Sequence, residues 1–253
     1  MMPLPASPTT GKPAVPEVVQ RKFAIAIPTY NERENVRELI SQLNARLPSV
    51  RIFVVDDNSP DGTSGVVEEL QKTMPGIELL WRPRKNGLAS AYFHAFHRIV
   101  SDESVQYIVT MDADLSHGTD DLVRLITSVE HYDLIVGSRY IAGGEIKHWQ
   151  RWRWALSRFG NLYAGFITNI PITDVTAGFV IYSRDLLKML LRDGIRSEGY
   201  SFQIEMKYLA HRLGAKIKEV PISFVDRSRG RSKLGKSTVV EGVFMPWYLR
   251  LFR

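Results

Sequence analysis

From Phe23 onward, short apolar runs rich in β-branched residues alternate with amphipathic segments of helical length. The apolar runs lie at 23–28, 51–57, 77–81, 107–114 and 133–139. Between them, apolar residues repeat at helical spacing in 32–46 and 61–73. Strands that alternate with helices are typical of βαβ units. The alternation therefore predicts an α/β fold with a doubly wound, mostly parallel sheet.

The second half of the chain is less regular, because the alternation stops after Arg139. The segments that follow are an aromatic and basic stretch at 147–170, an apolar run at 175–183, a helical segment that ends at Gly214 and a strand-like segment at 217–225. We expect them to complete the cleft of the same domain rather than to form a second one.

The two ends of the chain differ from its body. Residues 1–20 are rich in Pro, Ala, Ser and Thr and have no apolar period, so we expect a flexible N-terminal extension over 1–21. The last residues mix aromatic and basic side chains, which predicts an amphipathic helix over 238–253 at a membrane surface. A single folded domain then spans 22–237.

Composition and charge exclude several classes of protein. The chain has no cysteine, which rules out disulfides, Cys-ligated zinc, iron–sulfur clusters and a Cys nucleophile. No GxGxxG follows the first run, so nothing points to a dehydrogenase. Neither a membrane span nor a signal peptide is recognisable, so we expect a cytoplasmic protein.

The positive charge is concentrated at the C-terminal end. The whole chain has a net charge of +6, and residues 226–253 hold seven Lys or Arg against two acids, a net of +5. Because the body is nearly neutral and the basic run has no interleaved aromatic platform, nucleic-acid binding is not expected. We expect the basic segment to face anionic lipid or a phosphorylated substrate.

Polar residues gather where three of the predicted strands end. They are 28–32 after the first strand, 56–59 after the second and 112–114 after the fourth. Because ligands of open parallel sheets sit beyond the carboxyl ends of the strands, these three segments predict one site. Asp56 or Asp57 would accept hydrogen bonds from base or ribose, an arrangement that suits a nucleotide-sugar.

Asp112 and Asp114 are the candidate metal ligands. Two residues apart on an extended backbone, they would point to the same face. Two like charges at one place call for a cation, and oxygen ligands favour Mg²⁺ or Mn²⁺ completed by substrate phosphates. The alternative is a polar strand-to-loop turn without an ion. His117, nearby, is expected to be structural rather than a ligand.

Eight motifs together resemble family 2 glycosyltransferases, and in particular polyprenyl (dolichyl) phosphate mannose synthases. They are PTYNE at 28–32, VVDDNSPDGT at 54–63, KNGLASA at 85–91, MDADLSH at 111–117, GSRY at 137–140, DVTAGFVIYSR at 174–184, GYSFQIEM at 199–206 and FVDRSRGRSKLG at 224–235. The resemblance implies a GT-A fold, a Rossmann-like sheet, over about residues 22–237.

The resemblance also implies roles for individual residues. The nucleotide-sugar would be bound by Pro28, Tyr30, Glu32, Asp56, Asp57, Lys85, Asp112, Ala113 and Asp114. The metal would be held by Asp112, Asp114 and Ser116. The acceptor phosphate would be bound by Arg139, Arg153, Ser157, Arg227 and Lys233, with Arg151 and Arg158 competing for the place of Arg153. The catalytic set would be Asp112, Asp114, Arg139, Arg227 and Lys233. Gln203 and Glu205 would line the acceptor side, or else lie on an exposed helix face.

The implied reaction is transfer of mannose from GDP-mannose to a polyprenyl (dolichyl) phosphate with inversion, which gives a β-linked product and GDP. A metal would stabilise the leaving diphosphate as a Lewis acid, and the anionic acceptor would need no strong general base. The loop with Arg227 and Lys233 would close over the substrates. Two alternatives stay open: a polyprenyl-phosphate glucosyltransferase that uses UDP-glucose, and a non-catalytic peripheral membrane module.

Aromatic and basic residues predict contact with a membrane surface. Trp149, Trp152 and Trp154 fall close to Arg151 and Arg153, a mixture that favours the bilayer interface. For Trp154, Phe159 and Phe166 we expect core packing instead. The protein would be peripheral on the cytosolic face of the endoplasmic reticulum or plasma membrane. Some relatives append transmembrane helices, which we expect this chain to lack, and others need a small membrane-anchored subunit.

Overall fold

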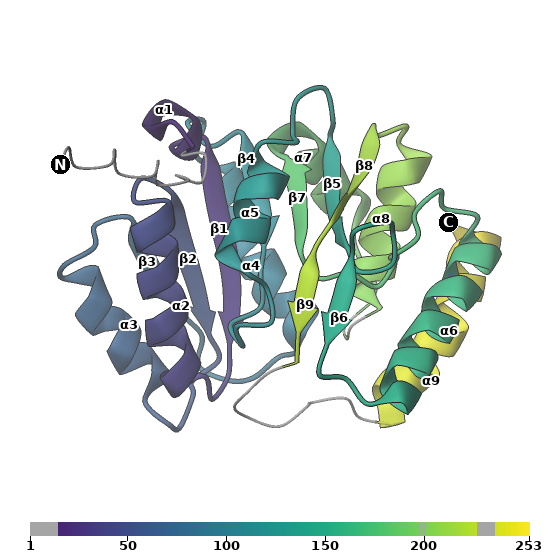
Figure 1. Cartoon of the computed structure of the whole chain (residues 1–253), viewed down its shortest axis with the longest axis horizontal. Coiled ribbons are helices and arrows are strands. Elements are labelled where there is room, and N and C mark those ends of the chain that lie inside the picture. Colours follow the sequence, from purple (N-terminus) through teal and green to yellow (C-terminus); the bar gives the residue numbers. More distant parts are fainter. Residues whose placement is uncertain (1–14, 198, 200, 227–235) are drawn as a thin grey trace, which may run out of the picture.

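The computed structural model describes residues 15–197, 199, 201–226 and 236–253. At its centre is a seven-stranded sheet in the order β3-β2-β1-β4-β7-β5-β8 (Figure 1). The strands are β1 (Phe23–Thr29), β2 (Arg51–Asp56), β3 (Ile77–Trp81), β4 (Tyr107–Thr110), β5 (Leu134–Ser138), β7 (Val180–Ser183) and β8 (Ile217–Pro221). A two-stranded sheet pairs β6 (Glu145–Lys147) with β9 (Ser223–Val225).

Helices cover both faces of the large sheet. They are α1 (Glu17–Gln20), α2 (Arg33–Arg46), α3 (Thr63–Gln71), α4 (Leu88–Val100), α5 (Thr119–Ile126), α6 (Arg151–Thr168), α7 (Arg184–Asp193), α8 (Phe202–Arg212) and α9 (Lys236–Phe252). Successive residues of β1 enter opposite apolar layers, because side chains alternate along a strand. Ile25 belongs to the layer that contains Leu39 of α2, whereas Ala26 belongs to the layer that contains Phe96 of α4.

The predicted doubly wound, mostly parallel sheet is confirmed. The pairs β1–β2, β1–β4, β2–β3 and β5–β8 are parallel. The exception is β7, which runs antiparallel to both β4 and β5. This strand comes from the apolar run at 175–183, and its insertion between β4 and β5 was not predicted.

The first described residues belong to the fold, so the expected flexible extension is corrected for 15–20. These residues include helix α1, and Val15 and Gln20 are buried. Gln20 Nε2 donates to the Val15 carbonyl at 2.7 Å, and Gln20 Oε1 accepts from the Ser49 amide at 3.0 Å. The Pro-rich composition concealed this anchor, because one apolar and one amide side chain are enough to form it.

The fourth strand is shorter than predicted. It was expected over 107–114, but β4 ends at Thr110, so Asp112 and Asp114 lie on a loop and not on an extended backbone. After the last strand residues, Leu115 takes a left-handed backbone conformation with φ of 62°. A left-handed residue changes the course of the backbone, which periodicity alone does not reveal.

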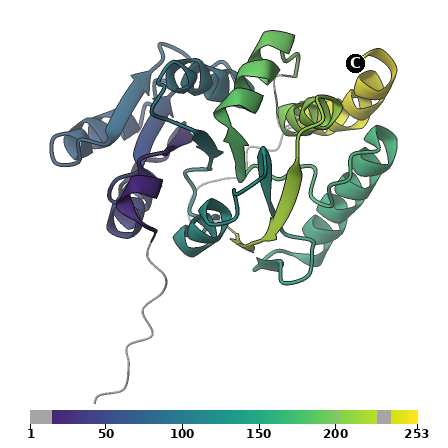
Figure 2. The ribbon, with the colours of Figure 1, turned by 90° about the horizontal axis from the view of Figure 1, so that it is seen from above.

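Helices α6 and α9 lie side by side at one end of the molecule (Figures 1 and 2). Tyr163 Oη donates to the Val243 carbonyl at 2.8 Å and accepts from Trp247 Nε1 at 3.0 Å, which fixes the two helices together. Leu249 of α9 is fully buried. The C-terminal helix was therefore correctly predicted as a helix, and part of its apolar side is used for packing.

Core packing was the wrong expectation for Trp154, Phe159 and Phe166, which are 48%, 67% and 89% exposed. The reason is that α6 lies at the edge of the fold and is covered by α9 on one side only. We call the exposed apolar residues of the two helices the α6–α9 surface. It comprises Trp152, Trp154, Leu156, Phe159, Leu162 and Phe166 of α6 and Val240, Val243, Phe244, Trp247, Leu251 and Phe252 of α9. Of the helices in the described part of the chain, none has the length and apolar character needed to cross a membrane.

Candidate active site

The candidate site lies at the carboxyl ends of β2, β1 and β4, which are neighbours in the sheet. Each of the three loops that follow these strands turns through a left-handed residue. They are Asn31 with φ of 57°, Asn58 with φ of 53° and Leu115 with φ of 62°. Asparagine tolerates this conformation well, whereas leucine rarely adopts it. The fold therefore brings together the three polar segments that the sequence analysis predicted to share one edge.

Asp56 joins the ends of β1 and β2. Its carboxylate is fully buried and accepts hydrogen bonds from Thr29 Oγ1 at 2.9 Å and from Ser59 Oγ at 2.6 Å. The Ser59 amide donates to its second oxygen at 3.0 Å. Both carboxylate oxygens of Asp56 therefore accept hydrogen bonds from the protein itself, and these bonds fix the loop in which the neighbouring Asp57 lies.

Asp57 is oriented by a buried arginine that the sequence analysis missed. Arg82 follows β3 and lies 2.6 Å from Asp57 Oδ1, and both side chains are more than nine-tenths buried. A second nitrogen of Arg82 donates to Ser90 Oγ at 2.7 Å. Nothing in the spacing of the chain links residues 57 and 82, because their contact depends on the pairing of β2 with β3.

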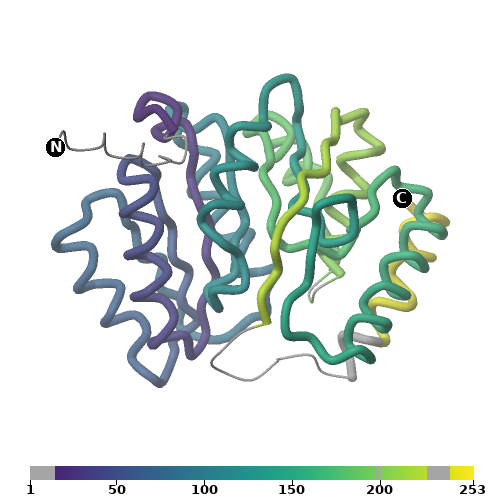
Figure 3. Tube along the Cα trace, in the orientation of Figure 1, coloured from purple at the N-terminus to yellow at the C-terminus, as the bar shows by residue number. Residues whose placement is uncertain are grey.

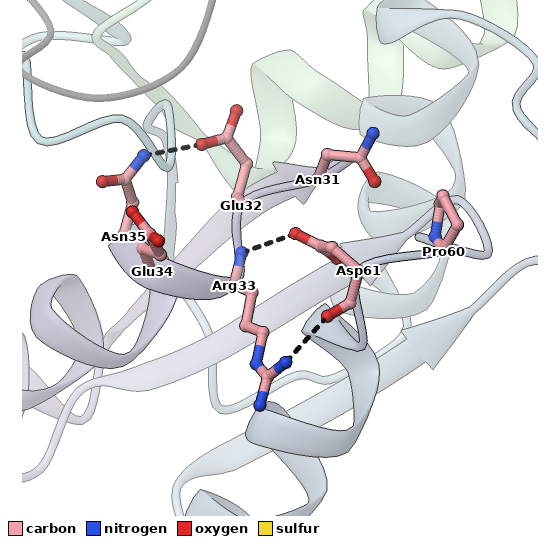
Figure 4. Close-up of a pocket in the computed structure, with 7 residues that line it drawn as sticks. All are labelled: Asn31, Glu32, Arg33, Glu34, Asn35, Pro60 and Asp61. Carbon is pink, nitrogen blue, oxygen red and sulfur yellow. Dashed lines mark hydrogen bonds between the residues drawn. The ribbon is translucent and has the colours of Figure 1, made fainter.

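Beside the first strand end, a shallow hollow of about 540 Å³ opens between the loops after β1 and β2 (Figure 4). Glu32 lines it and accepts from Asn35 Nδ2 at 2.8 Å. The Arg33 amide donates to Asp61 Oδ2 at 3.1 Å, so the two loops are linked across the hollow. Near this edge, Lys85 Nζ lies 4.1 Å from the ring centre of Tyr30, a cation–π contact. These contacts bring Tyr30, Glu32 and Lys85 to the edge of the sheet where they were expected.

The loop with the aspartate doublet is held from several sides. Asp114 is buried and accepts from the Ser116 amide at 3.1 Å. Asp112 accepts from Tyr92 Oη at 3.4 Å, and its own amide donates to His117 Nδ1 at 3.4 Å.

His117 stacks on Phe179 with ring centres 4.6 Å apart. Burial lowers the pKa of His117 to about 4, against the opposing pull of Asp114. The imidazole is therefore neutral and structural, as expected.

The donor set fits a hard divalent cation. Asp112 and Asp114 supply carboxylate oxygens, and the Ser116 hydroxyl is buried with no hydrogen-bond partner among the described residues. Within the same described residues, no three acidic or histidine side chains cluster as a metal cage would require. An ion held here would need oxygens from a substrate to complete its coordination, which is the usual situation of Mg²⁺ beside phosphates.

On the other side of the loop, Arg139 forms a bidentate ion pair with Asp174. Arg139 Nε and Nη2 lie 2.7 and 2.8 Å from the two oxygens of Asp174, whose side chain is fully buried. Burial alone would lower the pKa of Arg139, but the Asp174 carboxylate outweighs it and the net shift is upward. The guanidinium is permanently charged, and Asp174 fixes its plane. Asp174 begins the DVTAGF motif, which was the signal that could have revealed it.

The other described residues predicted to bind the acceptor phosphate, Arg153 and Ser157, lie in the first turns of α6. Arg153 lies 2.8 Å from Asp226, and Ser157 Oγ accepts from Tyr140 Oη at 2.7 Å. The guanidinium carbons of Arg139 and Arg153 lie 5.8 and 4.9 Å from the ring centre of Trp149. The structure thus brings Arg139 and Arg153 together over one indole, and Trp149 was not expected in this position.

Strand β9 connects the two sides of the site. The Val225 amide donates to the Ser116 carbonyl at 3.2 Å, Phe224 forms a β-bridge with His117, and Asp226 pairs with Arg153. The loop of Asp112 and Asp114 is therefore tied to β9, and Arg153 is tied to the residue that directly follows it.

The predicted residues Arg227 and Lys233 lie outside the described residues. Residues 230–237, GRSKLGKS, have the spacing of a phosphate-binding loop. That motif normally follows a buried parallel strand, whereas β9 is a three-residue strand of the small sheet, so the match does not indicate an NTPase. Gln203 and Glu205 are 3% and 0% exposed, which excludes the alternative of an exposed helix face.

Glu205 has a structural task. It accepts from the Ser197 amide at 2.8 Å and lies 3.6 Å from Arg253, near the end of α9. This buried carboxylate holds the segment between α7 and α8 and ties it to the C-terminal helix.

Comparison with known proteins agrees with this geometry. The sequence model of glycosyl transferase family 2 matches residues 24–191. The polyprenol monophosphomannose synthase of Mycolicibacterium smegmatis is 38% identical over 92% of this chain and 88% of its own length. The undecaprenyl-phosphate mannosyltransferase of Micrococcus luteus is 39% identical over 86% of this chain and 89% of its own length.

Among solved structures, glucosyl-3-phosphoglycerate synthase from Mycobacterium tuberculosis, crystallised with Mn²⁺, UDP and glucosyl-3-phosphoglycerate, is similar in fold. The two superpose with a TM-score of 0.64 at 16% identity, over 96% of this chain and 86% of the other. The expected GT-A fold is confirmed. With two thirds of its length matched by the family and relatives at 38–39% identity, the chain belongs to glycosyl transferase family 2.

Proposed function

We propose that this protein transfers mannose from GDP-mannose to a polyprenyl phosphate at a membrane surface. The observation that supports it best is the link through β9 between the Asp112–Asp114 loop and the arginines on and near α6. One sheet edge thereby holds a carboxylate doublet suited to a metal diphosphate and a basic cluster suited to a second phosphate. The names of the two mannosyltransferase relatives supply the sugar and the lipid.

In this proposal the donor lies across the ends of β1, β2 and β4. The nucleoside lies beside Glu32, Asp57 and Lys85. The ion pair with Arg82 fixes the orientation of the Asp57 carboxylate. Asp112, Asp114 and Ser116 hold Mg²⁺ or Mn²⁺, which when bound stabilises the negative charge on the departing diphosphate. The presence of Mn²⁺ and UDP in the structural neighbour supports such a metal.

The acceptor is already ionised, so the reaction needs positioning more than proton transfer. A phosphate oxygen of the lipid attacks the anomeric carbon as the bond to the diphosphate breaks, and an in-line attack inverts the configuration to β. Arg139 and Arg153 align the acceptor phosphate through guanidinium hydrogen bonds. No histidine is needed as a base, and the neutral, buried His117 is committed to the Asp112 amide.

The α6–α9 surface gives the protein a place to meet the lipid. Arg153 and Ser157 lie on the same helix as the exposed Trp152, Leu156 and Phe159. Aromatic and basic residues of one helix can therefore sit at headgroup depth while the acceptor phosphate reaches the arginines. We place the protein peripherally on a membrane, with this surface towards the bilayer.

The test is transfer of labelled mannose from GDP-mannose to a short polyprenyl phosphate by the full chain alone. We expect turnover that stops with EDTA and falls at least about 100-fold in Asp114→Asn. Asp120→Asn, an acid on α5 that is 53% exposed, serves as the matched control and should keep full activity. Undiminished turnover in EDTA would contradict the metal role.

A parallel assay with UDP-glucose decides the sugar, because the structural neighbour is also crystallised with UDP-glucose. Transfer of glucose but not mannose would replace the proposal by the glucosyltransferase alternative. Vesicle binding without transfer from either donor would favour a non-catalytic membrane module. Activity of the chain alone would show that no small membrane-anchored subunit is required.

A further inference from the structure

The DVTAGF motif forms a segment that the proposed chemistry has used only at its first residue. Residues 174–178 lie between α6 and β7 and contact several parts of the site. Arg139 Nη2 donates to Thr176 Oγ1 at 3.0 Å, and Thr110 Oγ1 donates to the Gly178 carbonyl at 2.7 Å. The segment is thus fixed to the acceptor arginine at one end and to β4 at the other.

A buried lysine forms hydrogen bonds with this segment. Lys207 of α8 is fully buried and its Nζ donates to the Ala177 carbonyl at 2.7 Å and to the Gln203 carbonyl at 3.2 Å. Gln203 Oε1 lies 3.5 Å from the same nitrogen. This contact places the amide of Gln203 with its oxygen towards Lys207. Nε2 must then point away from the lysine.

The direction in which Nε2 points is defined by Gly178. A β-carbon placed on Gly178 would lie 3.9 Å from Gln203 Nε2 and 3.8 Å from Asp112 Oδ2. The missing side chain therefore leaves room between an amide donor and a carboxylate acceptor. Gln203 is 3% exposed, and among the described residues its Nε2 has no hydrogen-bond partner. An amide donor without a protein partner can be satisfied by water or by a ligand.

We propose that the gap over Gly178 is a subsite for one hydroxyl group of the transferred sugar. The hydroxyl accepts a hydrogen bond from Gln203 Nε2 and donates one to Asp112 Oδ2. A carboxylate has about four acceptor positions, so accepting this bond does not prevent Asp112 from binding a metal as well. The inference rests on the proposed function, because it requires a sugar next to Asp112, and it assigns Gln203 and Gly178 to sugar recognition.

The test compares a nucleotide with the corresponding nucleotide-sugar. Gly178→Ala adds one methyl group at ordinary contact distance, and Gly178 does not have the left-handed backbone that would make alanine strained. With Mn²⁺ present, we expect titration calorimetry to show unchanged affinity for GDP and a loss of about tenfold for GDP-mannose. Gly65→Ala is the matched control, since a β-carbon there meets nothing within 4 Å, and it should change neither affinity.

A second variant keeps the inference testable if the alanine disturbs the loop. Gln203→Leu removes the amide hydrogen-bond donor, and we expect it to lower the affinity for GDP-mannose but not the affinity for GDP. Among GDP-deoxy-mannose donors, we expect one to bind the wild type about tenfold more weakly than GDP-mannose does. The same donor and GDP-mannose should bind Gln203→Leu with equal affinity, which is the result expected when the hydroxyl and Gln203 are coupled.

The two proposals fail in different ways. Suppose that the wild type binds GDP-mannose and transfers mannose. If both variants then lower the affinities for GDP and GDP-mannose equally, or lower neither, the subsite is wrong and the proposed function stands. If the wild type binds no nucleotide-sugar, the proposed function falls and the subsite falls with it.

Discussion

Lys207 of α8 carries a fully buried amino group, and the charged groups that act on it are Asp174, Arg139 and Glu219. Burial lowers its pKa to about 7, although Asp174 pulls in the opposite direction. Its three hydrogen-bond contacts are all to the segment at 174–178 or to Gln203. A group of this kind links the stability of the fold to the pH.

The pH dependence has a definite sign. The pKa of Lys207 is about 7 in the folded chain against 10.5 for an ordinary lysine. Between these values the unfolded chain keeps a proton that the folded chain has released, so stability rises with pH by up to about 1.4 kcal/mol per unit. Urea unfolding of the wild type and Lys207→Met at pH 7, 8 and 9 should show this extra slope in the wild type only. Equal slopes would mean that the lysine titrates normally.

Single residues also show where the sequence was informative. Asp56, Asp57, Asp112 and Asp114 could be placed at one edge because each follows an apolar run, and parallel strands end together. The shape of the loop after β4 could not be predicted, since it depends on a leucine in a left-handed conformation that leucine disfavours. The orientation of Asp57 was equally hidden, because Arg82 reaches it across a strand pair.

Among the elements, α6 shows the limit of periodicity most clearly. Four of its aromatic residues, Trp152, Phe159, Tyr163 and Phe166, recur at helical spacing and share one side, but such a stripe does not tell whether that side packs on the core or faces outward. The answer depends on where α9 lies, and α9 is about eighty residues away in the chain. The same holds for β7, because an apolar run carries no information about its direction in a sheet.

The exposed side of α6 leads to a prediction about membranes. Phe159 and Phe166 are 67% and 89% exposed, so replacing both by serine should leave the fold intact. Each phenylalanine buried in a lipid interface contributes about 1.5 kcal/mol or more, so the double variant should bind anionic vesicles at least about tenfold more weakly. Co-sedimentation with vesicles measures this.

The matched control for this experiment is Val18→Ser. Val18 is 67% exposed on α1, which lies at the opposite end of the molecule from α6 and α9 (Figure 3). Binding of this variant should equal that of the wild type. If Phe159→Ser with Phe166→Ser also binds normally, the α6–α9 surface does not face the bilayer.

At the scale of the whole molecule, the site has two halves. The regular half consists of the loops after β1, β2 and β4, and the irregular half consists of the residues around Arg139 and Arg153. That the loops after β1, β2 and β4 meet at one edge follows from a general rule about parallel sheets and was predictable from residues alone. The irregular half, which we propose binds the acceptor, depends on the pairs Arg139–Asp174 and Arg153–Asp226, which join residues 35 and 73 positions apart. Only the resemblance to a family pointed to Arg139 and Arg153, and it did not reveal their partners.

Because the two halves meet at the aspartate doublet, ligands should stabilise the molecule cooperatively. A ligand at about 100 times its dissociation constant adds about 2.7 kcal/mol of stability. We expect GDP with Mn²⁺ to raise the melting temperature by several degrees, and by more than the sum of the two separate shifts, since the ion has few protein ligands until the diphosphate completes its shell. Asp114→Asn should lose this excess, whereas Asp120→Asn should keep it. An equal shift by GDP in the presence of EDTA would mean that the nucleotide is bound by the protein alone, and the carboxylate doublet would then need another explanation.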